Sequence, residues 1–372
     1  MNVLQVINSL RFGGAERVVT NVAMHLNREH ADVTVEVCTL FDGGIWGQRL
    51  EEEGVVIHNI QVGKWNAPLA VARLYKLIAA KKYDVVHAHL WPSLYYTAAA
   101  SKLARHPAYV YTEHNTLNRR RHHRSLRWLE AGVYSSYEAI VANSFATESA
   151  LASWAPEVAP TIRVIENGVP THSVTKPSYR LSAPARLLVV GRLVHYKGID
   201  VAIEAVRHLI GRGVSVSMTV LGAGPQEDSL RNQADGLPVE FLGFQDEPQR
   251  WMATHDCLIV PSRWEGFGLT AVEGQMVGIP VVVSRIDNLA AMVNDGTTGT
   301  TFTPEDPADL AKKIEELLTD DQLRRRMSEN AKSEALRRWS IDRHISELLG
   351  LYSCLVSERA LSQAHLRDTR RR

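Results

Sequence analysis

Two carboxylates and a glycine-rich turn lie together in the segment PSRWEGFGLTAVEGQMVGIPVVVS (261–284). Glu265 and Glu273 are eight positions apart, and a fully formed helix of that length rises about 12 Å. Paired carboxylates in glycoside hydrolases are only roughly 5–9.5 Å apart. The two glutamates are therefore not expected to act as an acid and nucleophile pair. The spacing instead favours contact with two parts of one extended ligand.

The turn EGFG follows an apolar, strand-like run, and a helix is expected to begin near Gly268 or Leu269. Free backbone N–H groups and the positive end of the dipole at such a helix start suit an anion such as a diphosphate. A strand, turn and helix that merely carry two surface carboxylates explain the same pattern, so both interpretations stay open at this point.

A second cluster, GRLVHYKG (191–198), places Arg192 and Lys197 in a loop between a predicted strand and a predicted helix. Arginine is a fork-shaped donor for phosphate oxygens, and lysine is a mobile point charge. Together they could neutralise a diphosphate and stabilise it as a leaving group. A solvated basic loop is the alternative.

Two glycine turns, RFGGAE (11–16) and LGAGP (221–225), also follow predicted strands. Neither completes the G-x-G-x-x-G fingerprint, and no G-x-x-x-x-G-K-[ST] loop is present, which argues against a nicotinamide dehydrogenase. His87, His89 and His114 lie at predicted strand ends. They could suggest zinc, but no H-E-x-x-H or C-x-x-C spacing accompanies them, so no metal site is predicted.

The elements that must position these residues alternate between short apolar runs and amphipathic stretches. Such repeated strand–helix–strand units predict parallel sheets covered on both faces. The expected strands are 2–10, 33–40, 55–60, 84–90, 108–114, 138–144, 161–168, 186–193, 215–224, 239–244, 257–262 and 280–286, and the chain after 305 is expected to be helical.

The alternation pauses in VPTHSVTKPSYRLSAPA (169–185), which contains three prolines and no apolar periodicity. It is typical of an interdomain linker. We therefore expect a domain over 1–170, a linker over 171–185, a second domain over 186–340, and a C-terminal helical segment with a basic tail over 341–372. Because ligands bind outside the carboxyl ends of parallel strands, the two domains are expected to face each other across a cleft.

Composition agrees with two globular domains: 372 residues, of which 45% are apolar and 22% charged. A net charge of +1 argues against a general nucleic-acid binder. The three cysteines are too few and too far apart for a disulfide framework, which indicates a reducing, cytoplasmic location. The start MNVLQVINSL does not resemble a signal peptide, and no run of 18 apolar residues predicts a membrane span.

The stretch NRRRHHRSLRWLEAG (118–132) is strongly basic and contains interleaved apolar residues. A solvated charged helix is one interpretation. The other is a patch for anionic lipid headgroups or for a lipid-linked diphosphate, which would place the protein peripherally on a membrane. The residues of this patch are Arg119, Arg120, Arg121, Arg124 and Trp128.

Seven motifs occur in a fixed order along nearly the whole chain: FGGAE (12–16), DVVHAH (84–89), TEHN (112–115), ENGV (166–169), GRL…KG (191–198), GAGP (222–225) and PSRWEGFGLTAVEGQMVGIPVV (261–282). With them the chain resembles a family 4 retaining glycosyltransferase of the GT-B fold. The resemblance implies two doubly wound Rossmann-like domains, with C-terminal helices after the second. It also implies a nucleoside diphosphate sugar donor on the C-terminal domain, an acceptor on the N-terminal domain, and neither a metal ion nor a cofactor.

By this resemblance Arg192 and Lys197 would grip the donor diphosphate, and Glu265 would contact hydroxyls of the transferred sugar. Glu273 would accept hydrogen bonds from the ribose. The backbone N–H groups near the sugar and phosphate would come from Gly266, Phe267, Gly268 and Leu269.

In the N-terminal domain, the resemblance implies that Gly14 lets a loop approach the diphosphate and that His114 lies near the transferred sugar. His89 would form a wall of the acceptor site or would be purely structural, and both roles remain open. One departure is Gly274, where the family more usually has alanine. Another is Glu113, to which no role is assigned.

The sequence thus predicts a retaining glycosyltransferase that moves a hexose or N-acetylhexosamine from a nucleoside diphosphate sugar to a hydroxyl of a glycan, carried on a lipid, in cell-surface polysaccharide or glycolipid synthesis. In this family the departing diphosphate helps to receive the acceptor proton. A GT-B nucleotide-sugar epimerase is an alternative that the EGFGL frame disfavours. A non-catalytic nucleotide-sugar-binding subunit is a further alternative, and the joint presence of Arg192, Lys197 and Glu265 argues against it.

Overall fold

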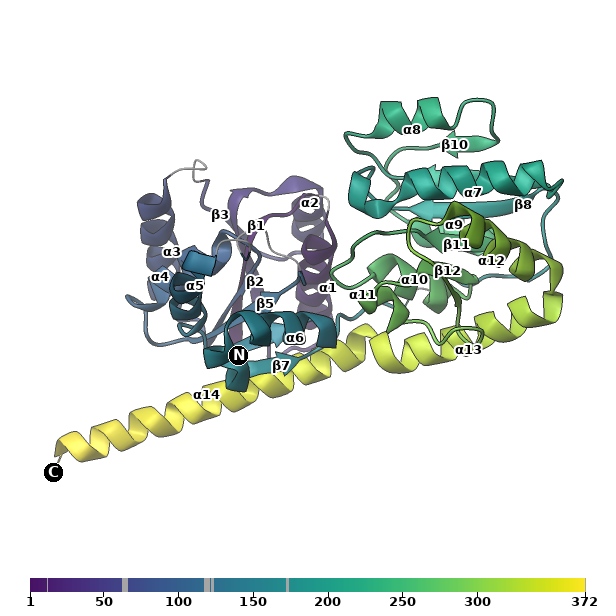
Figure 1. Ribbon diagram of the computed structural model, residues 1–372. Helices are drawn as coiled ribbons and strands as arrows, with labels where there is room; N and C mark the ends of the chain where they lie inside the picture. Colours follow the sequence, from purple (N-terminus) through teal and green to yellow (C-terminus); the bar gives the residue numbers. More distant parts are fainter. Residues whose placement is uncertain (12, 62–65, 117–120, 122–123, 172–173, 372) are drawn as a thin grey trace. The chain divides into compact units, whose positions relative to one another are not determined.

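The computed structural model describes the chain except residues 12, 62–65, 117–120, 122–123, 172–173 and 372, and for residues 124 and 363–371 it describes the backbone alone. The chain forms two compact units (Figure 1). Unit 1 comprises Met1–Pro170 and Ile341–Arg372, and unit 2 comprises Thr171–Ser340. The C-terminal helix therefore packs as part of the first unit, although unit 2 separates it from the rest of that unit in sequence.

Unit 1 contains a parallel sheet whose described strands run in the order β3-β2-β1-β4-β5-β6-β7. The chain order reverses between β1 and β4, which makes this the switch point of the sheet. The strands are β1 (Asn2–Ser9), β2 (Thr34–Asp42), β3 (Ile57–Asn59), β4 (Val85–His89), β5 (Ala108–Glu113), β6 (Ala139–Ala142) and β7 (Ile162–Val164).

Helices cover both faces of the unit 1 sheet. Their described bounds are α1 (Gly14–Glu29), α2 (Gly44–Glu52), α3 (Ala67–Lys81), α4 (Ser93–Ser101), α5 (Arg127–Tyr134), α6 (Phe145–Trp154) and α14 (Ile341–Arg371), with 3₁₀ turns η2 (Arg124–Leu126) and η3 (Pro156–Thr161). The long helix α14, yellow in Figure 1, contacts α1 and β5. It buries Ile345, Leu348 and Tyr352 at helical spacing, which fixes this stretch of α14 to the core.

Unit 2 is a second parallel sheet, with the order β10-β9-β8-β11-β12-β13 and a switch point between β8 and β11. Its strands are β8 (Ala185–Val190), β9 (Val216–Leu221), β10 (Val239–Phe241), β11 (Cys257–Val260), β12 (Val281–Ser284) and β13 (Thr300–Phe302).

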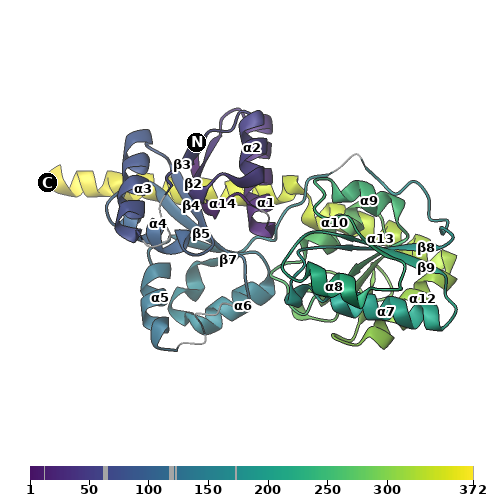
Figure 2. The same cartoon turned by 90° about the horizontal axis from the view of Figure 1, so that it is seen from above.

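Figure 2 shows α9 and α10 on one face of this sheet and α7, α8 and α12 on the other. The helices of unit 2 are α7 (Ile199–Gly211), α8 (Glu227–Gln233), α9 (Pro248–Thr254), α10 (Leu269–Val277), α11 (Asp287–Ala290), α12 (Pro307–Thr319) and α13 (Asp321–Trp339), with a 3₁₀ turn η4 (His195–Lys197). The two sheets confirm the predicted fold class.

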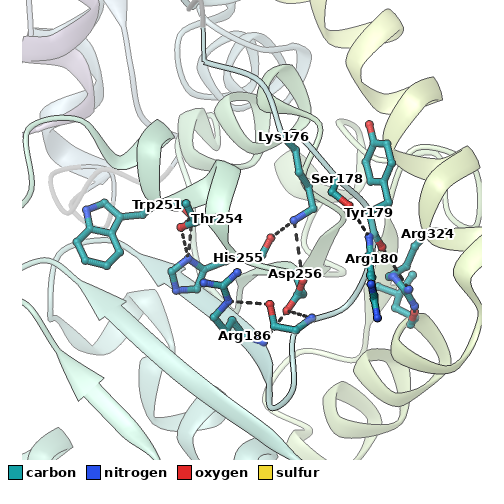
Figure 3. A network of polar contacts seen from close by, with 12 residues as sticks. Lys176, Ser178, Tyr179, Arg180, Arg186, Trp251, Thr254, His255, Asp256 and Arg324 are labelled. Carbon is teal, nitrogen blue, oxygen red and sulfur yellow. Dashed lines mark hydrogen bonds and ion pairs between the residues drawn. The ribbon is translucent and has the colours of Figure 1, made fainter.

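The proline-containing segment 171–185 is fastened to unit 2 in its described part (Figure 3). The backbone N–H of Lys176 donates to the carbonyl of Val277 at 2.9 Å. The Lys176 ammonium, with a side chain only 5% exposed, donates to the carbonyl of His255 and lies 4.0 Å from Asp256 Oδ1. Asp256 Oδ2 also accepts from the backbone of Ser182 at 3.2 Å and of Arg186 at 2.8 Å.

The buried contacts of Lys176 and Asp256 lie away from the edge of the sheet at which ligands bind. Burial lowers the pKa of Lys176, while the charge of Asp256 opposes that shift. Asp256 immediately precedes β11, so the network lies at the amino end of the strands. Ligands of such sheets bind at the carboxyl ends. The network therefore holds the segment in place and is not part of a ligand site.

The predicted start of a helix at Gly268 or Leu269 is confirmed, because α10 begins at Leu269 with Gly268 as its N-cap residue. One strand, β13, was not predicted. It is only three residues long, with the sequence TTF, and it lacks the apolar run that identifies the other buried strands.

Candidate functional site

The predicted donor-site residues of unit 2 lie at its switch point. Arg192 and Lys197 follow β8, Glu265 follows β11, and these two strands are neighbours in the sheet. Lys197 Nζ and Glu265 Oε1 form an ion pair, with side chains 19% and 11% exposed. The structure thus brings together two motifs that are 68 positions apart in the chain.

The Glu265 loop is held by further hydrogen bonds. Ser262 Oγ donates to Glu265 Oε1 at 2.9 Å, and Ser284 Oγ donates to the carbonyl of Ser262 at 2.6 Å. Asn288 Nδ2, from α11, donates to the carbonyls of Glu265 and Gly266 at 2.8 and 2.9 Å. Both the carboxylate and the backbone of Glu265 are therefore fixed from several directions.

Glycines allow the loops at this edge to pack backbone against backbone. Gly198 has a φ of +67°, and a Cβ there would lie 2.0 Å from the carbonyl oxygen of Pro261. Gly222, in the GAGP turn after β9, has a φ of +139°, and a Cβ there would lie 1.9 Å from the carbonyl oxygen of Gly191. No side chain fits at either position, so the loops after β8, β9 and β11 form one assembly.

A bidentate ion pair joins the loop after β11 to the start of α7, and it was not predicted from the sequence. Arg263 donates to the two carboxylate oxygens of Asp200 at 2.8 and 2.7 Å, and to the carbonyl of His195 at 2.7 Å. Burial alone would raise the pKa of Asp200, but its bonds to Arg263 lower it below the usual value. We call Arg263 and Asp200 the loop clamp. The available signal was an arginine just past the end of β11 and an aspartate at the start of α7, the helix that follows β8.

The other predicted donor-site residues of unit 2 differ in how deeply they are buried. Glu273 lies one turn into α10 and is 3% exposed, and Phe267 is 4% exposed. Together with the 11% exposure of Glu265, this excludes the interpretation of two surface carboxylates. Arg192 is exposed, and its neighbour Leu193 donates a backbone hydrogen bond to Ala223 at 3.1 Å. The start of α10 directs the N–H groups of Leu269 and its neighbours towards the same edge.

In unit 1 the histidines lie at the corresponding switch point. His89 ends β4 next to β1, and His114 follows β5. His89 Nδ1 is 3.1 Å from His114 Nε2, and His89 Nε2 is 2.5 Å from Gln5 Oε1. Both histidines are buried. Gln5 lies in the middle of β1, and its place in this cluster was not predicted from the sequence.

The C-terminal helix reaches the same cluster. Tyr352, from α14, has its hydroxyl 2.6 Å from His87 Nδ1 and accepts from Gln5 Nε2 at 3.2 Å. His87 Nε2 is 2.7 Å from Thr112 Oγ1. No feature of the sequence connected residue 352 with this site.

Burial keeps these histidines neutral. It lowers the pKa of His87 and His89 well below the usual value, and it lowers that of His114 to about 3, aided by His344. His344, in α14, has a pKa of about 4, also through burial. A small cavity lies beside the cluster, with Asn167 and His344 in its lining.

The other predicted residues of unit 1 fall in different places. Gly14 is exposed at the start of α1, which follows β1. Trp128 on α5 is 79% exposed. Arg119 and Arg120 lie outside the described residues, as does the side chain of Arg124.

Arg121 was expected in a basic surface patch, but its side chain is largely buried. Its guanidinium donates to Glu113 Oε2 at 3.0 Å and to the carbonyl of Thr116 at 3.1 Å, and the side chain is only 11% exposed. Glu113, 3% exposed in its side chain, also accepts from the hydroxyl of Tyr134 at 3.1 Å. Arg121 is therefore an internal partner of Glu113, which gives a structural role to a glutamate that had none.

Two general features concern the described part of the chain. No group of three or more His, Cys, Asp or Glu side chains there is arranged to hold a metal ion. Within the same residues, no helix is both long and apolar enough to cross a membrane.

Two family models match the chain, one for each unit. "Glycosyltransferase Family 4" matches residues 12–173, and "Glycosyl transferases group 1" matches residues 176–334. A glycogen synthase of Mycobacterium tuberculosis is 31% identical over 283 residues, which covers 70% of this chain and 66% of that protein. This chain thus spans about two thirds of the length of that relative.

Other similar proteins cover more of the chain. A D-inositol 3-phosphate glycosyltransferase of Corynebacterium aurimucosum is 29% identical over 370 residues, which covers 87% of each chain. The crystal structure of Anabaena Alr3699/HepE with UDP and glucose has a TM-score of 0.82 and 23% identity, and the match covers 94% of this chain and 99% of that one.

Two parallel-sheet units with this match to solved structures define the GT-B fold. Since the two models together match nearly the whole chain up to residue 334, the protein belongs to the family 4 glycosyltransferases.

Proposed function

We propose that the protein is a retaining glycosyltransferase that moves a hexose or N-acetylhexosamine from a nucleoside diphosphate sugar to a hydroxyl of a glycan acceptor. The observation that carries this proposal is the meeting of Lys197 and Glu265 at the switch point of unit 2. A cation for the diphosphate and a carboxylate for sugar hydroxyls are the two groups that such a donor requires in one place.

The donor is proposed to bind unit 2. Arg192 and Lys197 neutralise the diphosphate, backbone N–H groups at the start of α10 add to this, and Glu273 accepts from the ribose. Solved structures of Alr3699/HepE contain UDP or UDP-glucose. These neighbours support a nucleoside diphosphate hexose here.

Lys197 is already paired in the structure, which shapes the mechanism. A bound diphosphate would share this cation with Glu265, so the carboxylate keeps Lys197 in place until the donor arrives. As the sugar–phosphate bond breaks, the growing negative charge of the leaving group strengthens its contacts with Arg192 and Lys197. The departing diphosphate then helps to receive the acceptor proton, and no side-chain nucleophile is required.

No metal or cofactor takes part in this proposal. Two protein cations and a helix dipole supply the charge that a metal would otherwise provide. Transfer is therefore expected to persist in the presence of a strong chelator. Loss of activity on chelation, restored by Mg²⁺ or Mn²⁺, would contradict this part of the proposal.

The acceptor is proposed to bind unit 1, with His89 in the wall of its site. Neutral imidazoles and amides offer donors and acceptors that suit uncharged sugar hydroxyls. We further propose that the acceptor is carried on a lipid, in cell-surface polysaccharide or glycolipid synthesis, and that the protein lies in the cytoplasm at the inner face of the membrane. Exposed Trp128 and Leu129 on α5 support a membrane-facing surface.

Vesicle binding tests the membrane contact. Changing Arg119, Arg120 and Arg124 to Ser should release the protein from anionic vesicles while hydrolysis of the donor persists, because each basic residue near such a surface contributes about 1 kcal/mol. Arg121 is left intact because it holds Glu113. A wild-type protein that ignores anionic vesicles at low salt would remove the support for a lipid-linked acceptor.

A panel of nucleotide sugars tests the function itself. Slow release of the nucleoside diphosphate supports a transferase, interconversion of two sugars supports an epimerase, and tight binding without turnover supports a binding subunit. The anomeric configuration of the product, measured by NMR, then tests retention. Thermal shift with each donor identifies the sugar and base, because a ligand of the folded state raises its stability.

A further inference from the structure

A continuous chain of buried hydrogen bonds connects the C-terminal helix with His114. It runs from the Tyr352 hydroxyl to the side-chain amide of Gln5, then to His89, and from His89 to His114, over donor–acceptor distances of 3.2, 2.5 and 3.1 Å. Every member is at most 6% exposed. We call this chain the histidine relay.

The amide of Gln5 determines where the protons lie. Its N–H donates to Tyr352, so its carbonyl oxygen faces His89 Nε2 and must accept a hydrogen bond from the N–H there. A neutral imidazole carries only one N–H, so His89 Nδ1 is an acceptor. The partner of that acceptor, His114 Nε2, must therefore carry the proton. It follows that Nδ1 of His114 is the basic, accepting nitrogen.

A side branch fits the same arrangement. The Tyr352 hydroxyl accepts from Gln5 and thus has its own proton available for His87 Nδ1, 2.6 Å away. His87 Nε2 then donates to Thr112 Oγ1 at 2.7 Å. Tyr352 and His87 thus each make one donor and one acceptor contact, and no donor faces another donor.

We propose that Tyr352 is a positioning residue for the reaction: acting through Gln5 and His89, it fixes the tautomer and orientation in which His114 meets the sugar. This proposal rests on the proposed function, because it assumes that His114 contacts the transferred sugar. Tyr352 itself touches only Gln5 and His87 among the relay and branch residues.

The anchoring of α14 supports this role. His344 Nδ1 lies 2.9 Å from the carbonyl oxygen of Glu166, and the backbone N–H of Ile341 donates to Val169 at 3.0 Å. A Cβ on Gly168 would lie 2.6 Å from the Cβ of His344, so the helix packs directly on the ENGV loop. Tyr352 thus projects from a helix that is fixed two turns earlier.

The test uses Tyr352→Phe in the full chain, with the histidine nitrogens followed by ¹⁵N NMR. In the wild type, His114 should be a single tautomer with its proton on Nε2. Without the hydroxyl, the Gln5 amide can face His89 with either end, so His114 should become a mixture of tautomers. Transfer should fall about fivefold in kcat with a smaller change in donor KM, the rate factor for one neutral hydrogen bond.

Tyr109→Phe is the matched control. Tyr109 is also a buried tyrosine of unit 1, but its hydroxyl donates to the backbone carbonyl of Ala104 at 2.5 Å and not to a histidine. It should lose stability and leave the tautomer of His114 unchanged. If Tyr352→Phe fails to fold, Gln5→Leu interrupts the same relay and should give the same mixture.

The outcomes separate this proposal from the proposed function. A wild-type His114 with its proton on Nδ1, or a single unchanged tautomer in both relay variants, overturns the positioning role even if transfer is observed. A mixture of tautomers with unchanged kcat also overturns it. A wild-type protein that transfers no sugar overturns the proposed function, whatever the spectra show.

Discussion

The side chains at the two switch points differ in charge and in burial. In unit 2, partly exposed charged side chains pair beyond the carboxyl ends of the strands. Lys197 pairs with Glu265, and Arg263 pairs with Asp200. In unit 1, buried neutral groups meet in and next to the strands themselves, such as His89 with His114. Two parallel sheets of the same kind therefore carry very different side chains at their switch points. Under the proposed function, unit 2 would recognise a charged ligand and unit 1 an uncharged one.

The proposed function gives a physical reason for this difference. A diphosphate carries charge, which mobile cations near solvent can bind without losing their own hydration completely. Sugar hydroxyls are uncharged and directional, so they are best selected by groups whose donors and acceptors are fixed in advance. We expect variants of the two sites to fail in correspondingly different ways.

Removing a cation from unit 2 should have the largest effect. Arg192→Ala should lower transfer by about 100-fold or more, because a charge-assisted contact of about 1.5–3 kcal/mol that strengthens in the transition state is lost together with its share of leaving-group stabilisation. Steady-state rates at limiting donor measure this. Arg207→Ala, which removes a surface arginine paired with Glu204 on α7, is the control and should retain wild-type rates.

Acid should destabilise unit 1 more than unit 2. The pKa of His114 is about 3 and that of His344 about 4 in the folded protein, against about 6.5 in an unfolded chain. The unfolded state therefore binds more protons below pH 6.5, and stability is lost as the pH falls from there towards the folded values. Each histidine should contribute a loss of about 1.6 kcal/mol between pH 6.5 and 5.

Hydrogen exchange at several pH values locates this loss. Amides of β4 and β5 should lose protection before those of β8 and β11. His255 in unit 2 also has a pKa lowered by burial, but it is a single group rather than a cluster. Equal loss in both sheets would show that the buried histidines do not distinguish the units.

Within unit 2, substitutions of Glu273 and of Glu265 should affect different kinetic constants. Glu273→Ala should raise the donor KM about tenfold and change kcat less, because contacts with the ribose are similar in the ground and transition states. Glu265→Gln, in contrast, should act mainly on kcat. A pure kcat effect of the Glu273 variant would reverse these two assignments.

Disrupting the loop clamp should have the smallest effect on transfer. Asp200→Asn loosens the loops that carry Lys197 and Glu265 without removing either residue, and it should lower kcat/KM about fivefold. Glu227→Gln, which breaks the comparable Glu227–Arg231 pair on α8, should change nothing. If Arg263→Gln and Asp200→Asn gave fully additive losses, the two residues would not act as one clamp.

Much of the fold and part of the site follow from the sequence. Apolar runs identified most of the strands. The family resemblance assigned Arg192, Lys197 and Glu265 to one donor site, and in the structure Lys197 and Glu265 do meet. β13 was missed because three residues give no periodicity. The interpretation of Arg121 as a surface charge did not anticipate that Glu113, buried at a strand end, needs a cation.

The histidine relay could not be predicted, for a different reason. Gln5 and Tyr352 are 347 positions apart, and both fit their local patterns as ordinary strand and helix residues. Their contact depends on how α14 packs onto unit 1 after the whole of unit 2 has intervened. Local periodicity carries no information about such a return of the chain.

The discontinuity of unit 1 also has a consequence for synthesis. A ribosome makes residues 1–170, then all of unit 2, and only then α14. Until the last helix emerges, the surface that receives Ile345, Leu348 and Tyr352 stays uncovered, and Gln5 and His87 have no tyrosine to contact. All strands of unit 1 are made before unit 2, but its last helix is made after unit 2 is complete. Unit 1 is thus expected to be the second of the two units to reach its final packing.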